Sequence, residues 1–146
     1  MTEPVGITLV GHGATATGLL EAARAIVDDG ALADVVAVDA GKGETPELAP
    51  RLCDAIAAVD RGRGVVLLVD LLGASPCKCA QRQGKGHEVV VLAGLNLAML
   101  LKLAGLDRRR LDAAAVAEAC AESARRAVQV SGPVKTNPSS DPEVRS

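Results

Sequence analysis

Two residues in this sequence combine a nucleophilic side chain with a carboxylate that could orient it. His12 stands between Gly11 and Gly13, where an apolar stretch gives way to a segment of helical spacing. Asp70 closes a second apolar stretch, residues 65–70. An imidazole is a competent nucleophile near neutral pH, and a carboxylate on one ring nitrogen leaves the lone pair of the other nitrogen free. We therefore interpret His12 as a candidate nucleophile that Asp70 orients.

Short apolar stretches typical of buried strands alternate along the chain with segments of helical spacing. The predicted strands are residues 6–10, 34–39, 65–70 and 88–92, and the predicted helices are residues 16–27, 45–59, 96–102 and 111–126. Ser75 and Pro76 predict one further short helix, because serine is a good N-cap and proline a good first helical residue. This order indicates a doubly wound α/β fold, with a mainly parallel central sheet of four to five strands and helices on both faces.

The predicted fold brings His12 and Asp70 to one crevice. In a doubly wound sheet, ligands bind at the carboxyl ends of the strands, where the strand order reverses. The common order 2-1-3-4-5 places this reversal between the first and third strands, which lead into His12 and Asp70. Helices that begin after Gly13 and at Ser75 point their free N–H groups at the same place, and such groups favour a phosphate. We therefore interpret His12 as a residue that accepts a phosphoryl group and passes it on.

The chain fits one domain of ordinary size, followed by a tail of different composition. We assign residues 1–130 to the domain, because no repeat or boundary interrupts them. Residues 131–146 hold three of the seven prolines, with serine, asparagine and aspartate between them. Because such a segment has little apolar surface to bury, we expect a flexible C-terminal tail.

The composition argues against several kinds of partner. The net charge is −2 without a basic block, and the chain has no phenylalanine, tryptophan or tyrosine on which bases could stack, so we expect no nucleic-acid partner. The longest uncharged apolar run, residues 89–101, is too short to span a bilayer, and we expect no membrane insertion. We recognise no targeting signal, and we expect the four cysteines to be the reduced thiols of a cytoplasmic protein.

Two further patterns carry weaker signals. Cys77 and Cys79 could suggest metal or redox chemistry, but no zinc spacing links them to Cys53, Cys120 or His87. We interpret these cysteines as small hydrophobic residues, and we expect no metal and no cofactor. The glycine-rich loops lack the G-x-x-x-x-G-K-[ST] pattern of a phosphate-binding loop, so we expect no nucleotide site.

Three segments, residues 6–20, 64–80 and 91–103, together resemble the mannose-type enzyme IIA domain of the bacterial phosphoenolpyruvate:sugar phosphotransferase system. The resemblance extends over about residues 6–130. It implies that His12 is the phosphorylated residue and that Asp70 orients it. Gly13, Gly73, Ala74 and Ser75 are then the residues expected to bind the phosphoryl group, the last three in an anion-binding turn that ends at Pro76.

The same resemblance implies the partners. A protein of the HPr kind would donate the phosphoryl group, and a protein of the enzyme IIB kind would accept it on the way to sugar transport. The resemblance also implies a homodimer in which a short C-terminal strand is exchanged between subunits, and residues 127–130 are the candidate for that strand.

The sequence departs from the family pattern in two places and leaves other functions open. Leu71 and Leu72 stand where the family often has an aromatic residue, and a thiol-rich segment follows. We recognise no enzyme IIB domain after the tail, so a regulatory module whose phosphorylation state controls a partner is the alternative. The phosphoryl donor subunit of dihydroxyacetone kinase has a related fold, but the stretch 94–97 fits the mannose type better.

Overall fold

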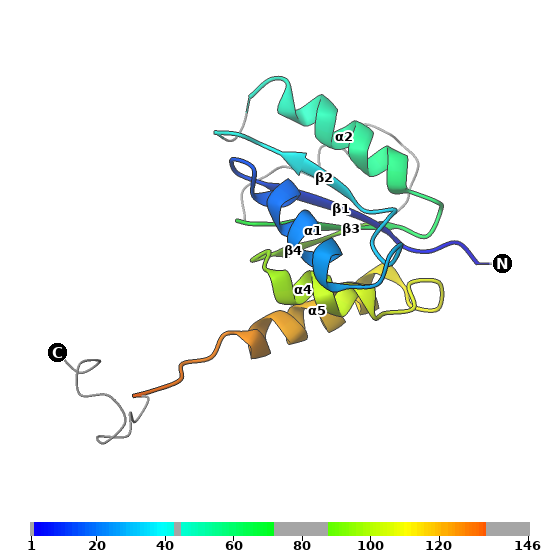
Figure 1. The fold of residues 1–146 in the computed structure, drawn as a ribbon. Coiled ribbons are helices and arrows are strands. Elements are labelled where there is room, and N and C mark those ends of the chain that lie inside the picture. Colours follow the sequence, from blue (N-terminus) through cyan, green and yellow to red (C-terminus); the bar gives the residue numbers. More distant parts are fainter. Residues whose placement is uncertain (1, 43–44, 72–87, 134–146) are drawn as a thin grey trace, which may run out of the picture.

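A computed structural model describes residues 2–42, 45–71 and 88–133. In these ranges the chain forms a four-stranded, fully parallel sheet of order β2-β1-β3-β4 (Figure 1). The strands are β1 (Gly6–Gly11), β2 (Val36–Asp39), β3 (Val65–Val69) and β4 (Val89–Ala93). The chain leaves β1 to one side for β2 and returns to the other side for β3, so the strand order reverses at β1.

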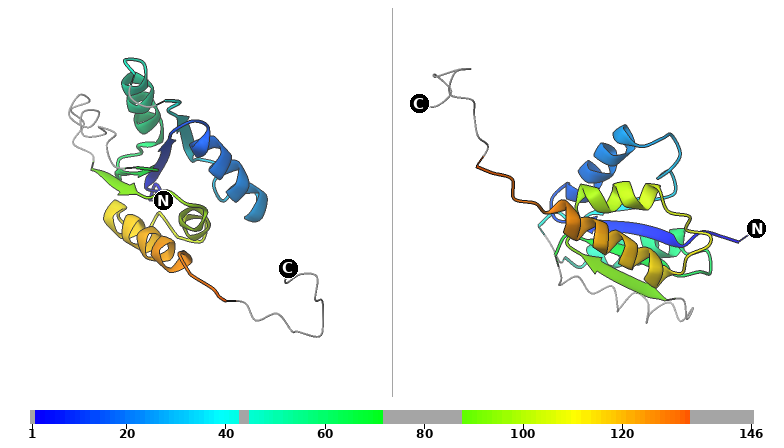
Figure 2. Two further views of the ribbon diagram at one scale, coloured as in Figure 1. Left: turned by 90° about the vertical axis from the view of Figure 1, so that its left-hand side faces the viewer. Right: turned by 90° about the horizontal axis from the view of Figure 1, so that it is seen from below.

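Helices cover both faces of the sheet, which confirms the predicted fold class (Figures 1 and 2). They are α1 (Thr15–Ile26), α2 (Leu48–Val59), α4 (Leu97–Ala104) and α5 (Ala113–Ala127). One apolar core lies between the sheet and α1, α4 and α5, and a second core lies between the sheet and α2. No helix in the described part of the chain is long and apolar enough to cross a membrane.

The central strands β1 and β3 are buried on both faces, because helices cover both faces. Ile7 and Leu9 point into the core of α1, α4 and α5, whereas Val10 points towards α2. Gly6 is required by close packing, since a Cβ atom there would lie 2.3 Å from the carbonyl oxygen of Val59 at the end of α2.

Helix caps explain where two helices begin. Asn96 caps α4 as its sequence predicts, and its side-chain oxygen accepts a hydrogen bond from the N–H of Met99 at 3.0 Å. Helix α5 begins two residues later than predicted, because Asp112 is its N-cap and accepts from the N–H of Ala115 at 2.7 Å.

Two elements are shorter than predicted. Helix α2 starts at Leu48 instead of residue 45, and Pro50 lies in its first turn, where a missing N–H costs no helical hydrogen bond. Strand β2 starts at Val36, because Asp34 pairs with Arg108 and the carbonyl of Val35 accepts from Arg24. The short helix predicted at Ser75 lies outside the described residues.

The cysteines differ from the expectation of reduced thiols. Cys53 on α2 is disulfide-bonded, so the expectation is wrong at this position. Cys120 is a free and fully buried thiol on α5, and its burial raises its pKa to about 11. Cys77 and Cys79 lie outside the described residues. No group of three or more histidine, cysteine or acidic side chains suited to a metal occurs among the residues that the structure describes.

Candidate functional site

The structure brings His12 and Asp70 into direct contact. Nδ1 of His12 lies 2.9 Å from Oδ2 of Asp70, and the backbone N–H of His12 donates to the same oxygen at 2.8 Å. His12 follows the last residue of β1, and Asp70 follows the last residue of β3. Val10 and Val69 are partners in the β1–β3 ladder, so the two parallel strands end side by side and place both side chains at the switch point.

The carboxylate of Asp70 is held by the backbone around it. Its Oδ1 accepts from the N–H of Leu71 at 2.8 Å. Partial burial would raise the pKa of Asp70, but the hydrogen bonds from the backbone and ring of His12 and from Leu71 outweigh it and hold this pKa below its ordinary value. Asp70 is therefore ionised at neutral pH.

An ionised Asp70 fixes the tautomer of His12. The carboxylate can only accept, so Nδ1 carries the hydrogen, and in the neutral ring Nε2 carries the lone pair. The side chain of His12 is 52% exposed, whereas that of Asp70 is 21% exposed. The imidazole of His12 is therefore about half-exposed, whereas the carboxylate that orients it is more covered.

The two glycines around His12 make the turn from β1 into α1. Gly13 has a φ of +57°, in the region that favours glycine, and its N–H donates to the carbonyl of Gly41 at 2.7 Å. Ala40 donates to the carbonyl of Gly11 at 2.8 Å. A Cβ atom on Gly11 would lie 3.1 Å from the Cβ atom of Thr15. The histidine therefore stands between glycines because the helix begins directly above the end of the strand.

The start of α1 contacts a carboxylate that the sequence reasoning missed. Asp39, the last residue of β2, accepts from the N–H of Thr17 at 3.0 Å and from its hydroxyl at 2.6 Å. These hydrogen bonds from Thr17 hold the pKa of Asp39 below its usual range. The sequence contains a signal for this second carboxylate, because the segments 34–39 and 65–70 both end in Val-Asp. Two parallel strands that end in this way place two carboxylates at the same end of the sheet.

The predicted phosphate-binding residues divide into two groups. Gly13 lies next to His12, but its N–H is engaged by Gly41. Gly73, Ala74 and Ser75 lie outside the described residues. The assignment of all four to phosphate binding stays a prediction.

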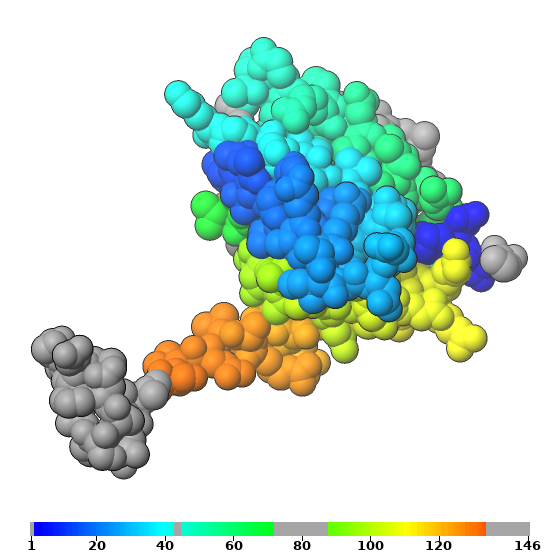
Figure 3. Space-filling view, in the orientation of Figure 1, coloured from blue at the N-terminus to red at the C-terminus, as the bar shows by residue number. Residues whose placement is uncertain are grey.

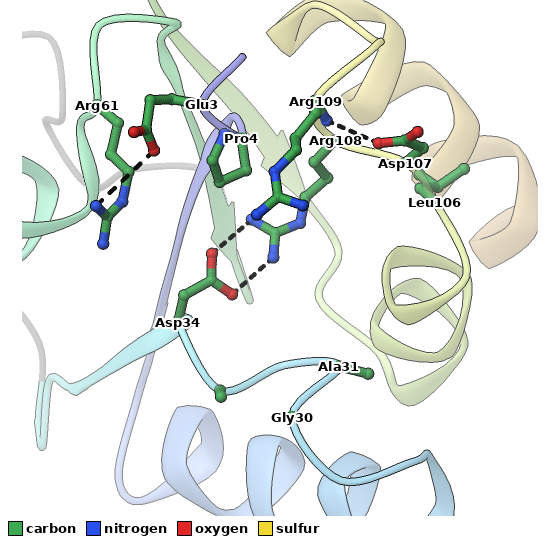
Figure 4. A pocket seen from close by; sticks show the side chains of 11 residues that line it. Glu3, Pro4, Gly30, Ala31, Asp34, Arg61, Leu106, Asp107, Arg108 and Arg109 are labelled. Atoms are coloured by element: carbon green, nitrogen blue, oxygen red, sulfur yellow. Dashed lines mark hydrogen bonds and ion pairs between the residues drawn. The ribbon is translucent and has the colours of Figure 1, made fainter. Parts of the chain in front are cut away.

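A cavity of about 450 Å³ lies at the opposite end of the sheet, among residues that precede β1, β2 and β3 and the loop before α5 (Figure 4). Arg108 crosses it and pairs with Asp34 through two bonds of 2.6 and 2.9 Å. Arg61 and Glu3 approach to 3.9 Å across its rim. These charges compensate one another, and the cavity contains no nucleophile, so it is not the site.

The fold and the site together define a class of protein: small doubly wound α/β domains that present an aspartate-bound histidine at the switch point of the sheet. Within this class, the family model described as "PTS system fructose IIA component" matches residues 6–124. The match covers most of the chain, and the protein belongs to this family of phosphotransferase-system IIA components.

Solved structures with the same fold have low sequence identity to this chain. A PTS IIA protein associated with the fucose utilization operon of Streptococcus pneumoniae is 22% identical, with a TM-score of 0.69 over 89% of this chain and 96% of its own. A mannose/sorbose-specific IIA subunit from Enterococcus faecalis is 24% identical, with a TM-score of 0.66 over 92% and 99%. A sigma-54 interaction domain protein, also from Enterococcus faecalis, is 17% identical, with a TM-score of 0.65 over 87% and 97%. No curated protein matches the sequence significantly.

Proposed function

We propose that this protein accepts a phosphoryl group on Nε2 of His12 from a carrier protein of the HPr kind and passes it to an acceptor of the enzyme IIB kind. One observation carries this proposal. Asp70 bonds Nδ1 of His12 at 2.9 Å, so that the other ring nitrogen is left with its lone pair on a half-exposed side chain. Membership of the family of phosphotransferase-system IIA components also supports phosphoryl transfer.

The transfer is an exchange of one nitrogen–phosphorus bond for another. The Nε2 lone pair of His12 attacks the phosphorus of the donor's phosphohistidine, and the electron pair of the breaking bond returns to the donor's ring nitrogen. Nδ1 keeps its hydrogen throughout. The negative charge of Asp70 stabilises the positive charge that develops on the ring as Nε2 gives up its lone pair. The reverse step passes the group to the acceptor.

The phosphoryl oxygens need hydrogen-bond donors. At the start of α1, the N–H groups of Thr15 and Thr17 already donate to His12 and Asp39. We therefore assign the binding of these oxygens to the backbone of Gly73, Ala74 and Ser75, with Gly13 allowing a close approach. The segment 73–75 follows Asp70 closely in the sequence, which supports this assignment.

The surroundings of His12 suit a protein partner. Leu71, next to Asp70, is a large apolar side chain that is 66% exposed. An apolar residue beside an exposed charged pair favours the brief docking of a carrier protein, which brings the phosphoryl group on its own side chain. Because such carriers work in the cytoplasm, we place this protein there as well.

We also propose a homodimer. After α5 the chain continues away from the domain as an extended segment (Figures 1 and 3). Val128 and Val130 in this segment are 78% and 100% exposed. Strand β4 is the last strand of the described sheet, and Val91 in its middle is 37% exposed. The edge of β4 in the described sheet and the two exposed valines would both be covered if a partner subunit added its C-terminal segment to β4.

A regulatory module is the second candidate function. The similarity to a sigma-54 interaction domain protein favours it, because that relative is described by an interaction and not by transport. The two functions share the chemistry of His12 and differ in the acceptor. Transfer of labelled phosphoryl groups from this protein to a purified enzyme IIB supports the carrier function. Retention of the label with enzyme IIB present supports regulation.

The test of the proposal is phosphorylation by the phosphotransferase cascade. The protein is incubated with phosphoenolpyruvate, enzyme I and HPr, and its intact mass is measured. We expect one phosphoryl group, lost in acid and kept in base. The chain has two histidines, so His12→Ala and His87→Ala form a matched pair. Loss of labelling only in His12→Ala is the expected result, and equal labelling of His12→Ala and the parent would refute the assignment.

A further inference from the structure

Two strand-end carboxylates flank the turn that holds His12. Asp39 ends β2 on one side of β1, and Asp70 follows β3 on the other side. Asp39 is the ladder partner of Gly11, the residue before His12. Because residues alternate between the faces of a strand, Asp39 shares its face with Ala37, which packs in the core that includes α1. A carboxylate therefore stands at the end of each strand that neighbours β1.

The two carboxylates have different partners. Asp70 accepts from His12, whereas both oxygens of Asp39 accept from Thr17, the third residue of α1. An N-terminal helix end carries partial positive charge and attracts anions. At the N-terminal end of α1, the carboxylate of Asp39 already takes the place of such an anion. The end of a helix that would otherwise attract the phosphoryl group therefore already has a negative charge beside it.

We propose that Asp39 is a positioning residue for phosphotransfer at His12, which fixes the start of α1 through Thr17 and keeps a negative charge close to the phosphorylated ring. This inference rests on the proposed function of His12. It assigns Asp39 two separable effects, one through its hydrogen bonds and one through its charge.

The hydrogen bonds position the His12 turn. Thr15 donates to the carbonyl of His12 at 3.1 Å, so the first turn of α1 and the histidine backbone are coupled. Thr17, two residues further on, ties that turn to the end of β2. Loss of the hydroxyl bond loosens this link and slows transfer, because a small misplacement of a nucleophile costs a large factor in rate.

The charge acts on the phosphorylated product. Strand neighbours lie about 4.8 Å apart, and His12 directly follows the ladder partner of Asp39, so the backbones of the two residues are close at this end of the sheet. For like charges about 10 Å apart in a partly solvated site, the repulsion changes an equilibrium by about threefold to tenfold. Asp39 therefore makes phosphohistidine less stable and easier to discharge, which is the property that a phosphoryl carrier needs.

The experiment measures the rate and the equilibrium of phosphoryl exchange between phosphorylated HPr and the full-length protein. Asp39→Asn keeps the shape of the side chain and removes its charge, and we expect it to shift the equilibrium about threefold or more towards phosphorylated protein. Thr17→Val keeps the charge of Asp39 and removes the hydroxyl bond, and we expect slower transfer with an unchanged equilibrium. Thr17→Ser restores the hydroxyl and is expected to restore the rate.

The controls separate this inference from the proposed function. Asp29→Asn removes one charge from an exposed residue before β2, at the opposite end of the sheet, and is expected to leave the equilibrium unchanged. If Asp39→Asn is folded by its melting temperature and shows the parent's equilibrium, the role of Asp39 is refuted while His12 keeps its function. If the parent itself takes no phosphoryl group on His12, the proposed function fails instead.

Discussion

At the scale of the residue, one carboxylate oxygen of Asp70 fixes the orientation of His12. Oδ2 of Asp70 accepts both from the ring of His12 and from the backbone N–H of the same residue. The ring is thereby tied to its own main chain, which is fixed in turn by the end of β1. A histidine held in this way loses little freedom when it meets a partner, because its orientation is already set.

Replacement of Asp70 by asparagine tests whether this carboxylate orients His12 for transfer. The amide introduced by Asp70→Asn keeps the shape of the carboxylate but loses the charge, and its NH₂ group can turn the imidazole to the wrong tautomer. We expect transfer from the HPr-type donor to slow by about tenfold or more, which corresponds to about 1.4 kcal/mol of transition-state stabilisation. Stopped-flow or quench-flow phosphorylation measures the rate, and a melting curve checks the fold. An unchanged rate in a folded variant would remove Asp70 from the site.

At the scale of the elements, continuous apolar runs made the strands predictable, whereas contacts between distant residues did not follow from local patterns. Strand β3 was recognisable because a strand buried on both faces reads as an unbroken apolar run. The contact of Asp39 with the start of α1 was missed, because Asp39 and Thr17 are far apart in sequence and belong to different elements. Sequence periodicity placed His12 and Asp70 at one crevice, because both follow strands that the fold makes adjacent.

The ion pair between Asp34 and Arg108 links the segment before β2 to the loop before α5. Partial burial would raise the pKa of Asp34, but the bidentate contact with Arg108 outweighs it and lowers this pKa below the ordinary value. The contribution of Asp34 to stability is therefore present above its unfolded pKa of about 3.9 and is lost as the pH falls through its lower folded value.

We expect Asp34→Asn to destabilise the protein at pH 7, because the side chain of Arg108 is only 9% exposed and loses its charged partner. The expected loss is roughly 1–2 kcal/mol, below that of a fully buried pair since Asp34 keeps contact with solvent. Urea unfolding at pH 7 and at about pH 3 measures both effects, because the cost of the substitution should shrink in acid. An equal cost at both pH values would contradict the ion-pair account.

At the scale of the whole molecule, the described residues form one sheet with helices on both faces, and an extended segment leaves it after α5 (Figures 1 and 2). Val130 is fully exposed there, so its side chain adds nothing to the packing of a single subunit. In the proposed strand exchange, the second subunit would cover this side chain.

A shortened chain separates the domain from the tail. We expect the protein without residues 131–146 to keep its melting temperature, its phosphorylation and its dimeric state, since those residues are assigned to the tail. Val130→Asp in this shortened chain is expected to give monomers, because the new charge would be buried in the exchanged strand. Analytical ultracentrifugation measures the oligomeric state of both. A monomeric shortened chain, or a dimeric Val130→Asp variant, would contradict the proposed dimer.

Nε2 of His12 is the atom proposed to carry the phosphoryl group, and nitrogen-15 labelling of histidine identifies the nitrogen that is phosphorylated. The labelled protein is phosphorylated by phosphoenolpyruvate, enzyme I and HPr, and the nitrogen that is bonded to phosphorus is identified by its coupling in the NMR spectrum. Because Asp70 Oδ2 lies 2.9 Å from Nδ1 of His12, we expect phosphorus to be bonded to Nε2. We expect no phosphorus–nitrogen coupling in the spectrum of His12→Ala. Phosphorus on Nδ1 of His12, or on any residue other than His12, would contradict this proposal.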